Sequence, residues 1–383
     1  MVKKDFLLFL ILISVISCKE NYPSKYTLTE SNEYVHFKID NETFIPKKRI
    51  NYFISKNGSE YISFQNNQMS EILIYNIKNG EIENKIKFEE EGPDGIIGGI
   101  AQFYINDFNK IYITSWEGKN IYVTDTTGVI KKKTNYSFTT DYNALISAFS
   151  NPIALVDKYI YIPQTPNRHL GERVMEDSRV GVLLDTTSNI IHLLPMKFPP
   201  LITFKDIGTS AGFGADYNYC FDGTHFIYSF HYSDQLYRTS IDHKKIELFF
   251  AKSKYIDKVE VLRSNTSDFN KVLKKTCEHA SYRDIIYDKY RNVYYRFSYL
   301  QTEIEENENY LDLIHYGKKV FSIIVLNKEL EIIGETLFPE YTYNPRMYFV
   351  NSNGLYISTS HYKNPSFNEN ILSFQKINLT KNK

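Results

Sequence analysis

The sequence predicts an all-β protein in which six four-stranded antiparallel sheets form the blades of a propeller. Three observations lead to this fold class: a strand pair that recurs six times, turn residues between the strands, and an aromatic-rich composition. Of the 383 residues, 32 are Tyr and 26 are Phe, whereas Trp occurs once. Tyr and Phe side chains favour the pleated, half-buried surfaces of β-sheets.

The recurring strand pair has a simple pattern. Its first strand begins with an apolar residue followed by Tyr, and its second strand ends in Asp or Asn. In one copy, KIYITSW from Lys110 is followed by NIYVTD, which ends at Asp125. The copies lie roughly 50 to 70 residues apart, a spacing that suits propeller blades. The recurring tyrosines are Tyr61, Tyr112, Tyr161, Tyr228, Tyr294 and Tyr356.

Each strand pair is flanked by further strands and by turn residues. In the second copy, AQFYIND from Ala101 precedes the pair and VIKKKTNY from Val129 follows it. Each unit is therefore predicted to be a four-stranded meander, with tight turns such as Asp222-Gly223. The Asp or Asn that ends the pair is predicted to bond its own backbone in the turn. Because one sheet cannot bury both of its faces alone, the sheets are predicted to stack around a channel.

The two ends of the chain are predicted to meet in one sheet. The last unit is one strand short, and an unassigned strand, YVHFKI, occupies residues 34–39. We expect this strand to complete the sixth blade, with Val35 and Phe37 close to Leu372 and Phe374. The alternative is a pair of separate β-sandwich domains, which would not need six equivalent units.

The N-terminus resembles a lipoprotein signal segment. Lys3 and Lys4 precede an apolar run from Phe6 to Ser17 that is too short to span a membrane comfortably. The run ends in VISC, which resembles a bacterial lipobox, so Cys18 is predicted to carry a lipid. An ordinary secretory signal with a chance Cys is the alternative. The predicted divisions are a signal peptide at 1–17, a tether at 18–33 and a propeller at 34–383.

A lipid on Cys18 would make the protein an outer-membrane lipoprotein that faces the periplasm or the cell surface. Two other cysteines, Cys220 and Cys277, remain in the mature chain. Outside the cytoplasm they could form a disulfide. Two free, buried thiols are an equally open alternative.

Several kinds of chemistry are disfavoured. The 45 basic and 45 acidic residues balance, which argues against a nucleic-acid-binding protein. His225 and His231 would lie about 20 Å apart along one strand, so they are interpreted as turn and edge histidines. The acidic run at 303–308 lacks EF-hand spacing, and the Gly-rich stretch at 91–99 lacks the Lys-Ser/Thr of a phosphate loop. No cofactor or metal site is predicted.

The predicted pocket is at the channel, near the starts of the innermost strands. Three long insertions, between blades four and five, inside blade three (residues 167–179) and inside blade five, leave the rigid scaffold and are typical places for binding residues. The first contains SDFNKVLKK, a predicted short helix capped by Ser267 or Asp268. Two arginines near the axis could clamp a carboxylate, sulfate or phosphate, or form structural ion pairs instead. The candidate ligand-binding residues are Asp216, Tyr219, His279, Tyr282, Arg283 and Arg346.

Several segments together resemble an uncharacterised family of Bacteroidota lipoproteins with a TolB-like six-bladed propeller. They include EEEGPDG, LLPMKFPP, YNYCFDGTHFIYSF, IIYDKYRNVYYRF and FSIIVLNKELEIIGETLFPEYTY. The resemblance spans essentially the mature chain and implies the fold and the compartment, but no catalytic residues. DTT at Asp125 and Asp185 also resembles the short O-glycosylation sequence of Bacteroidota, which would modify Thr126 and Thr186. A role in the turn alone explains DTT equally well.

These observations favour a lipid-anchored module that binds a glycan, a peptide or a partner protein. The alternative is an enzyme, a lyase or hydrolase with an Arg/His/Tyr site at the channel mouth. Such an enzyme should bring His279, Arg283, Tyr219 and an acid together in one pocket. A third possibility is a structural subunit of an outer-membrane complex.

Overall fold

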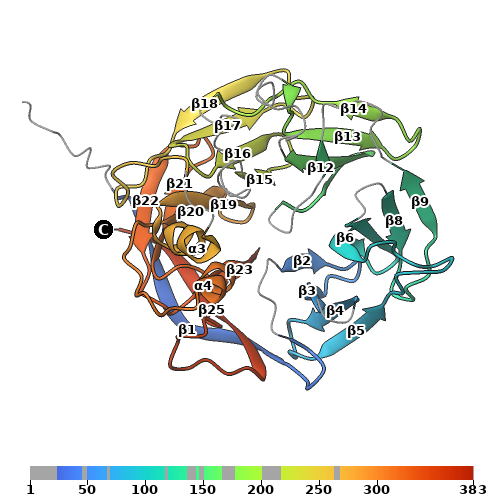
Figure 1. Ribbon diagram of the computed structural model, residues 1–383, viewed down its shortest axis with the longest axis horizontal. Coiled ribbons are helices and arrows are strands. Elements are labelled where there is room, and N and C mark those ends of the chain that lie inside the picture. The colour runs from blue at the N-terminus through green and yellow to red at the C-terminus, as the bar shows by residue number, and fades with distance from the viewer. Residues whose placement is uncertain are drawn as a thin grey trace, which may run out of the picture.

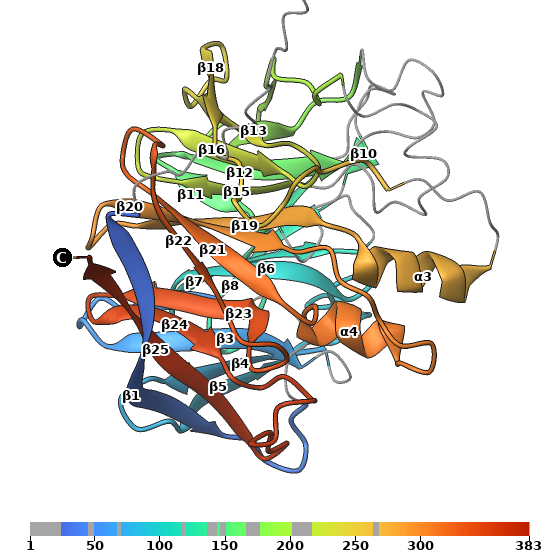
Figure 2. The same ribbon diagram turned by 90° about the vertical axis from the view of Figure 1, so that its left-hand side faces the viewer.

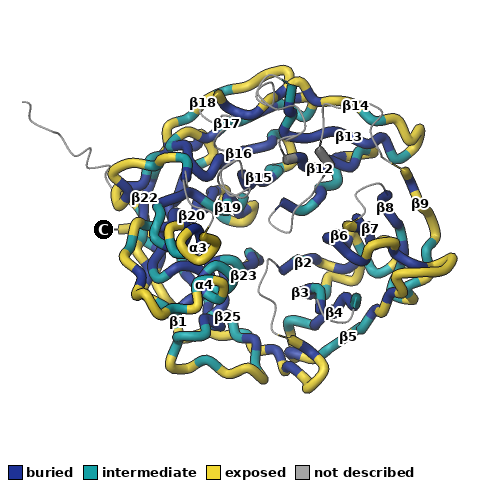
Figure 3. The backbone as a smooth tube through the Cα atoms, viewed as in Figure 1, coloured by how far each residue is buried: buried dark blue, intermediate teal, exposed yellow. Residues whose placement is uncertain are grey.

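The predicted fold class is confirmed by a computed structural model of the chain, in which six antiparallel sheets surround a central axis (Figure 1). The structure describes residues 24–44, 50–66, 70–116, 120–135, 144–145, 151–165, 177–200, 217–262 and 268–382. Buried residues follow the strands, and exposed residues concentrate in the peripheral loops (Figure 3). No helix in these ranges is both long and apolar enough to cross a membrane.

The first three blades follow each other along the chain. Blade 1 contains β2 (Asn51–Ile54), β3 (Glu60–Asn66), β4 (Glu71–Asn76) and β5 (Ile82–Lys87). Blade 2 contains β6 (Ile100–Asp107), β7 (Lys110–Ser115), β8 (Asn120–Thr124) and β9 (Lys132–Asn135). Blade 3 contains β11 (Ala154–Val156), β12 (Tyr159–Thr165), β13 (Gly181–Asp185) and β14 (Ile191–Leu193), and the short β10 (Ala144–Leu145) also pairs with β12.

The last three blades carry the two helices named within the described ranges and the strands at both ends of those ranges. Blade 4 contains β15 (Tyr217–Phe221), β16 (Phe226–Phe230), β17 (Gln235–Thr239) and β18 (Ile246–Phe250). Blade 5 contains β19 (Ser281–Asp288), β20 (Val293–Tyr299), β21 (Phe321–Leu326) and β22 (Ile332–Leu337). Blade 6 contains β23 (Asn344–Asn351), β24 (Gly354–Ser358), β25 (Ile371–Lys381) and β1 (Tyr26–Lys38).

The sequence repeat corresponds to the second and third strands of each blade. All six recurring tyrosines lie on second strands, and each is at most 4% exposed. The predicted hydrogen bonds between side chain and backbone in the turns form in five blades. In each, a side-chain oxygen accepts from the backbone N–H two residues further on. The accepting residues are Asn76, Asp125, Asp185, Asp242 and Asn327. In blade 6 the equivalent Asn378 lies inside β25 and pairs with Thr29, because the N-terminal strand continues the sheet there.

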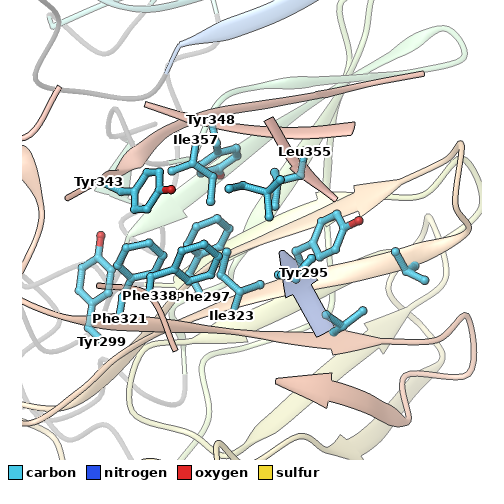
Figure 4. Packing of buried hydrophobic residues seen from close by; sticks show 14 of the residues in the cluster. Tyr295, Phe297, Tyr299, Phe321, Ile323, Phe338, Tyr343, Tyr348, Leu355 and Ile357 are labelled. Atoms are coloured by element: carbon cyan, nitrogen blue, oxygen red, sulfur yellow. The ribbon is translucent and has the colours of Figure 1, made fainter. Parts of the chain in front are cut away.

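Six hydrophobic clusters fill the spaces between successive blades, and every blade contributes to two of them. Figure 4 shows the cluster between blades 5 and 6, where the Phe297 and Tyr348 rings stack with centroids 5.1 Å apart. Burying one such side chain stabilises the fold by about 1.5–3 kcal/mol. The alternative of two separate sandwiches is wrong, because each sheet packs against a neighbour on both faces.

The ring closes as predicted, with β1 antiparallel to β25. Val35 pairs with Phe374, and Phe37 pairs with Leu372. However, β1 begins at Tyr26, so part of the expected tether belongs to the sheet. An irregularity between Glu30 and Tyr34 interrupts the alternation of side chains, which conceals the first half of the strand in the sequence.

Two helices lie together on one face of the ring, and the C-terminus lies towards the opposite face (Figure 2). α3 (Phe269–Glu278) begins after Asp268, whose carboxylate accepts from the N–H groups of Asn270 and Lys271, as the cap prediction expected. α4 (Tyr310–Tyr316), capped by Asn309, lies in the insertion of blade 5 and has only seven residues. The two helices enclose a small core of their own, which includes Cys277 and Leu313.

The two described cysteines are buried and are not joined by a disulfide. Cys220 belongs to the cluster between blades 4 and 5, whereas Cys277 belongs to the core under the helices. Burial raises the pKa of the Cys277 thiol to about 11, so this thiol is protonated at neutral pH.

Candidate functional site

Arg283 and Arg346 line a single cavity of about 160 Å³ next to α3 and α4. We call it the cationic cavity, because a third basic residue, Lys318, joins them there. Blades 4, 5 and 6 supply its polar wall, and the two helices supply its apolar wall. The polar wall consists of Asn218, His231, Arg283, Asp284, Tyr299, Lys318 and Arg346, and the helices contribute Thr276, Leu313 and Ile314.

Irregular strands position both arginines. In β19, Tyr282 pairs with Ser298 and Ile285 pairs with Arg296, so two residues, Arg283 and Asp284, oppose a single residue. In β23 the register shifts between Asn344 and Tyr348, around Arg346. Such bulges redirect side chains and are common beside functional sites. The two innermost strands therefore depart from regular pairing at the residues that line the cavity.

Lys318 reaches the cavity because α4 stops abruptly before it. Gly317, the C-cap of α4, has a φ of 100°, which favours glycine. A Cβ at this position would lie 2.4 Å from Cδ of Pro345, so the helix end packs directly against the bulge of β23. Lys318 is 5% exposed, and its Nζ donates to the carbonyl oxygen of His279.

A chain of hydrogen bonds orients Arg283. Its Nη1 lies 2.9 Å from Nδ1 of His231, and Nε2 of His231 lies 2.6 Å from Oδ1 of Asn218. Because a guanidinium can only donate, Nδ1 must accept and the proton must be on Nε2. Asn218 in turn donates to Oδ1 of Asp284 at 3.0 Å. His231 is therefore neutral and holds the arginine in place.

Burial and repulsion between like charges lower the pKa values of Lys318 and His231. Burial, reinforced by the charge of Arg283, holds the pKa of Lys318 well below its usual value. Burial and the neighbouring cations hold the pKa of His231 well below its usual value. Nε of Arg283 is buried without a hydrogen-bond partner among the described residues. Two arginines, a lysine of lowered pKa and an unused donor, against one described carboxylate, favour an anion in the cavity.

Tyr282 is one of the predicted ligand-binding residues, but it lies in the interface between blades 4 and 5 and not in the cavity. Its hydroxyl donates to Oδ1 of Asp234 at 2.5 Å and accepts from the N–H of Ser253 at 3.0 Å. The guanidinium of Arg296 lies 3.6 Å from the centre of its ring. Neighbouring residues of a strand point to opposite faces, so Tyr282 enters the interface whereas Arg283 enters the cavity.

The remaining predicted residues are elsewhere. Tyr219 lines a separate cavity on the ring axis, and its hydroxyl donates to the carbonyl oxygen of Pro152. His279 caps α3, and its Nε2 donates to the carbonyl oxygen of Glu260 at 2.6 Å. The grouping of His279, Arg283 and Tyr219 that the enzyme hypothesis requires therefore does not form. Asp216 and Cys18 lie outside the described residues.

Sequence reasoning missed Lys318 and His231. Lys318 lies at the end of the insertion in blade 5, so this long insertion is the sequence feature that indicates a binding residue there. His231 was interpreted as an edge histidine, but it is 2% exposed and bonds two residues that line the cavity. Within the described ranges, no group of three or more His, Cys, Asp or Glu residues is placed to hold a metal ion.

The predicted glycosylation positions lie in hairpin turns. Thr126 follows β8 and Thr186 follows β13, and both are partly exposed. The Thr186 hydroxyl donates to the carbonyl oxygen of Lys158 at 2.8 Å, so it already has a structural partner. Modification of these residues stays a prediction.

The fold and the cavity define a six-bladed β-propeller with a cationic pocket beside its axis. Residues 25–337 match the family model "Domain of unknown function (DUF4221)", and the chain belongs to this family. This confirms the resemblance to an uncharacterised propeller family.

Solved structures share this fold. A DUF4221 family member from Bacteroides vulgatus has a TM-score of 0.78 and 26% identity, and the match covers 94% of this chain and 100% of that one. A protein from Bacteroides fragilis that is described as exported has a TM-score of 0.53 and 12% identity, with 93% and 96% covered. Comparison with curated proteins gives no match.

Proposed function

We propose that this protein is an extracytoplasmic binding module that holds an anionic group of its ligand in the cationic cavity. The observation that carries the proposal is the convergence of Arg283, Lys318 and Arg346 on one cavity. Arginine forks match the geometry of carboxylate, sulfate and phosphate oxygens. A glycan, peptide or protein partner would be held through such a group.

The size of the cavity limits what can enter. Its volume of about 160 Å³ is below the roughly 300–1,000 Å³ of sites that enclose a whole small molecule. The cavity therefore suits a single compact oxyanion, with the remainder of the ligand outside it.

The hydrogen-bond pattern supports binding over catalysis. His231, the imidazole that lines the cavity, is bonded at both ring nitrogens, and its lowered pKa makes it a weak base. A general base needs a free nitrogen within reach of the substrate. Tyr219 and His279, which the enzyme hypothesis would combine with Arg283, do not line this cavity.

A lipid anchor would direct the cavity away from the membrane. Tyr26 at the start of β1 pairs with Lys381, and the N–H of Asn382 donates to the carbonyl oxygen of Lys25. The C-terminus lies on the face opposite α3 and α4 (Figure 2). A lipid on Cys18, joined by a short tether, would place the membrane at that opposite face. The similar Bacteroides fragilis protein, described as exported, supports an extracytoplasmic location.

Calorimetric titration with phosphate, sulfate and acetate tests the proposal. We expect at least one of these anions to bind, and Arg283→Ala and Arg346→Ala to weaken binding roughly 10- to 100-fold, because each removes a charged hydrogen-bond donor. The matched control is Arg238→Ala, since Arg238 pairs with Glu247 on the outer strands of blade 4. Unchanged affinity in both cavity variants, or no binding of any of the three anions, would contradict the proposal.

A further inference from the structure

A second cavity of about 350 Å³ lies on the ring axis, and we call it the axial channel. All six blades contribute to its wall, through the innermost strands and the residues next to them. Its volume falls within the range of sites that hold a complete small molecule. The axial channel therefore differs in capacity from the cationic cavity.

The lining of the axial channel is uncharged. Its described residues are five tyrosines, one asparagine and apolar side chains, with no acidic, basic or histidine residue among them. A charged ligand would lose its water there without gaining a counter-charge, which is costly. The axial channel therefore favours a neutral ligand.

Two lining residues offer polar atoms that the described protein groups do not use. Nδ2 of Asn51 donates to the carbonyl oxygen of Phe103 at 3.3 Å, and no described donor satisfies its Oδ1. The hydroxyl of Tyr104, the next residue along β6, has no hydrogen-bond partner among the described residues. Both side chains are partly buried. A purely apolar ligand would displace the water around them and would not replace the hydrogen bonds that this water makes. A fitting ligand brings donors and acceptors of its own.

Two further tyrosines are held in fixed positions. The Tyr219 hydroxyl donates to the carbonyl oxygen of Pro152, and the Tyr287 hydroxyl donates to Oδ1 of Asn292 at 3.0 Å. Side chains that are ordered before binding lose little entropy when a ligand arrives. The Tyr287 ring is partly exposed and offers apolar surface next to polar groups, a combination that suits a ring-shaped ligand.

We propose that the axial channel is a binding site for an uncharged ring that carries hydroxyl groups, the chemistry of a neutral sugar. The ring faces would pack on the tyrosines, and the hydroxyl groups would bond Asn51 and Tyr104. This proposal does not depend on anion binding in the cationic cavity, because the two cavities share no lining residue.

Saturation-transfer NMR tests the proposal on the purified chain, with glucose, galactose, mannose and N-acetylglucosamine as probes. We expect transfer to at least one sugar, and a roughly 3- to 10-fold weaker affinity in Tyr104→Phe and in Asn51→Ala, each of which removes one hydrogen-bonding group. Tyr104→Phe keeps the ring, so its thermal unfolding should match that of the unaltered chain. The control is Tyr255→Phe, since Tyr255 is exposed in the loop after blade 4.

Two results would overturn the proposal: no transfer to any of the four sugars, or transfer that both channel variants leave unchanged. The variants also separate it from the anion site. Arg283→Ala should leave sugar binding intact, and Tyr104→Phe should leave anion binding intact. Loss of sugar binding in Arg283→Ala would assign the sugar to the cationic cavity instead and would equally overturn the proposal.

Discussion

Arg296 in the interface between blades 4 and 5 and Arg283 in the cationic cavity beside it have opposite surroundings. Arg296 is fully buried, and its guanidinium donates to Ser229 and to the carbonyl oxygens of Ser233 and Ala251, at 2.6–3.0 Å. Arg283 is only partly buried, donates to His231 and keeps a buried Nε without a described partner.

The contrast shows how this protein distributes polar groups. In the interface, the protein itself satisfies the charged group, which fixes the position of one blade against the next. In the cationic cavity, Nε of Arg283 has no described partner and basic side chains lie close together, an arrangement that costs stability unless an anion arrives. We therefore expect interface residues to control stability and cavity residues to control binding.

The largest expected effect is on stability. Arg296→Met should lower the free energy of unfolding by about 3–5 kcal/mol, because it leaves buried carbonyl groups without donors. Denaturant unfolding measures this change, and Arg238→Met on the outer strands is the control. A loss below 1 kcal/mol would show that the interface does not depend on its arginine and would remove the contrast.

Acid should weaken the interfaces in a defined pH window. His243 packs between blades 3 and 4, and burial lowers its pKa to about 4 from 6.5. In the unfolded chain this histidine takes up a proton below pH 6.5, while in the folded protein it stays neutral. Its contribution to stability is therefore present above pH 6.5 and declines as the pH falls towards 4, by about 3 kcal/mol in total.

Urea unfolding at pH 7 and pH 4.5 tests this expectation. The midpoint should fall at the lower pH, and His243→Gln should reduce the fall. His361→Gln is a useful second variant, because burial also lowers the pKa of His361 to about 4. Equal midpoints at the two pH values would contradict the assignment of these histidines as neutral core residues.

The cavity arginine should behave in the opposite way. Arg283→Met should change the free energy of unfolding by less than about 1 kcal/mol, since it removes few protein contacts and relieves repulsion with Lys318. The same variant should weaken anion binding by about 1.5–3 kcal/mol, the range for a hydrogen bond to a charged group. Unfolding and calorimetry on the same preparation measure both values. Strong destabilisation would make Arg283 a structural residue like Arg296.

The smallest expected effect is the uptake of a proton by Lys318 when an anion binds. Because burial and the charge of Arg283 lower the pKa of Lys318, a bound anion should raise it and draw a proton from solution. Anion affinity should therefore decrease as the pH rises through the lowered pKa of Lys318. Titrations in buffers with different ionisation enthalpies detect the proton, and Lys318→Met should abolish its uptake. Uptake that persists in Lys318→Met would assign the proton to another group.

Much of the fold could be predicted because its signals are local. The strand with the recurring Tyr and the Asp or Asn that closes the next turn lie within one blade, and their pattern repeats six times. Pairing of Val35 and Phe37 with the last strand was also predictable, since a blade with three strands leaves an unpaired edge.

The site was only partly predictable, because it depends on contacts between distant segments. Arg283 and Arg346 were identified from their positions at the starts of innermost strands. Lys318 depends on how α4 packs against Pro345, and Tyr282 was misassigned because the sequence does not reveal which face of β19 meets blade 4. Register irregularities of this kind have no clear sequence pattern and decide which side chain enters the cavity.

The most direct test of the central claim is a crystal structure of the protein grown with selenate, whose selenium gives an anomalous signal. We expect an anomalous peak in the cationic cavity, with selenate oxygens within hydrogen-bond distance of Arg283 and Arg346, and no such peak in crystals of Arg283→Ala. Selenate bound only at other positions, or a cavity that stays empty of it, would contradict the account.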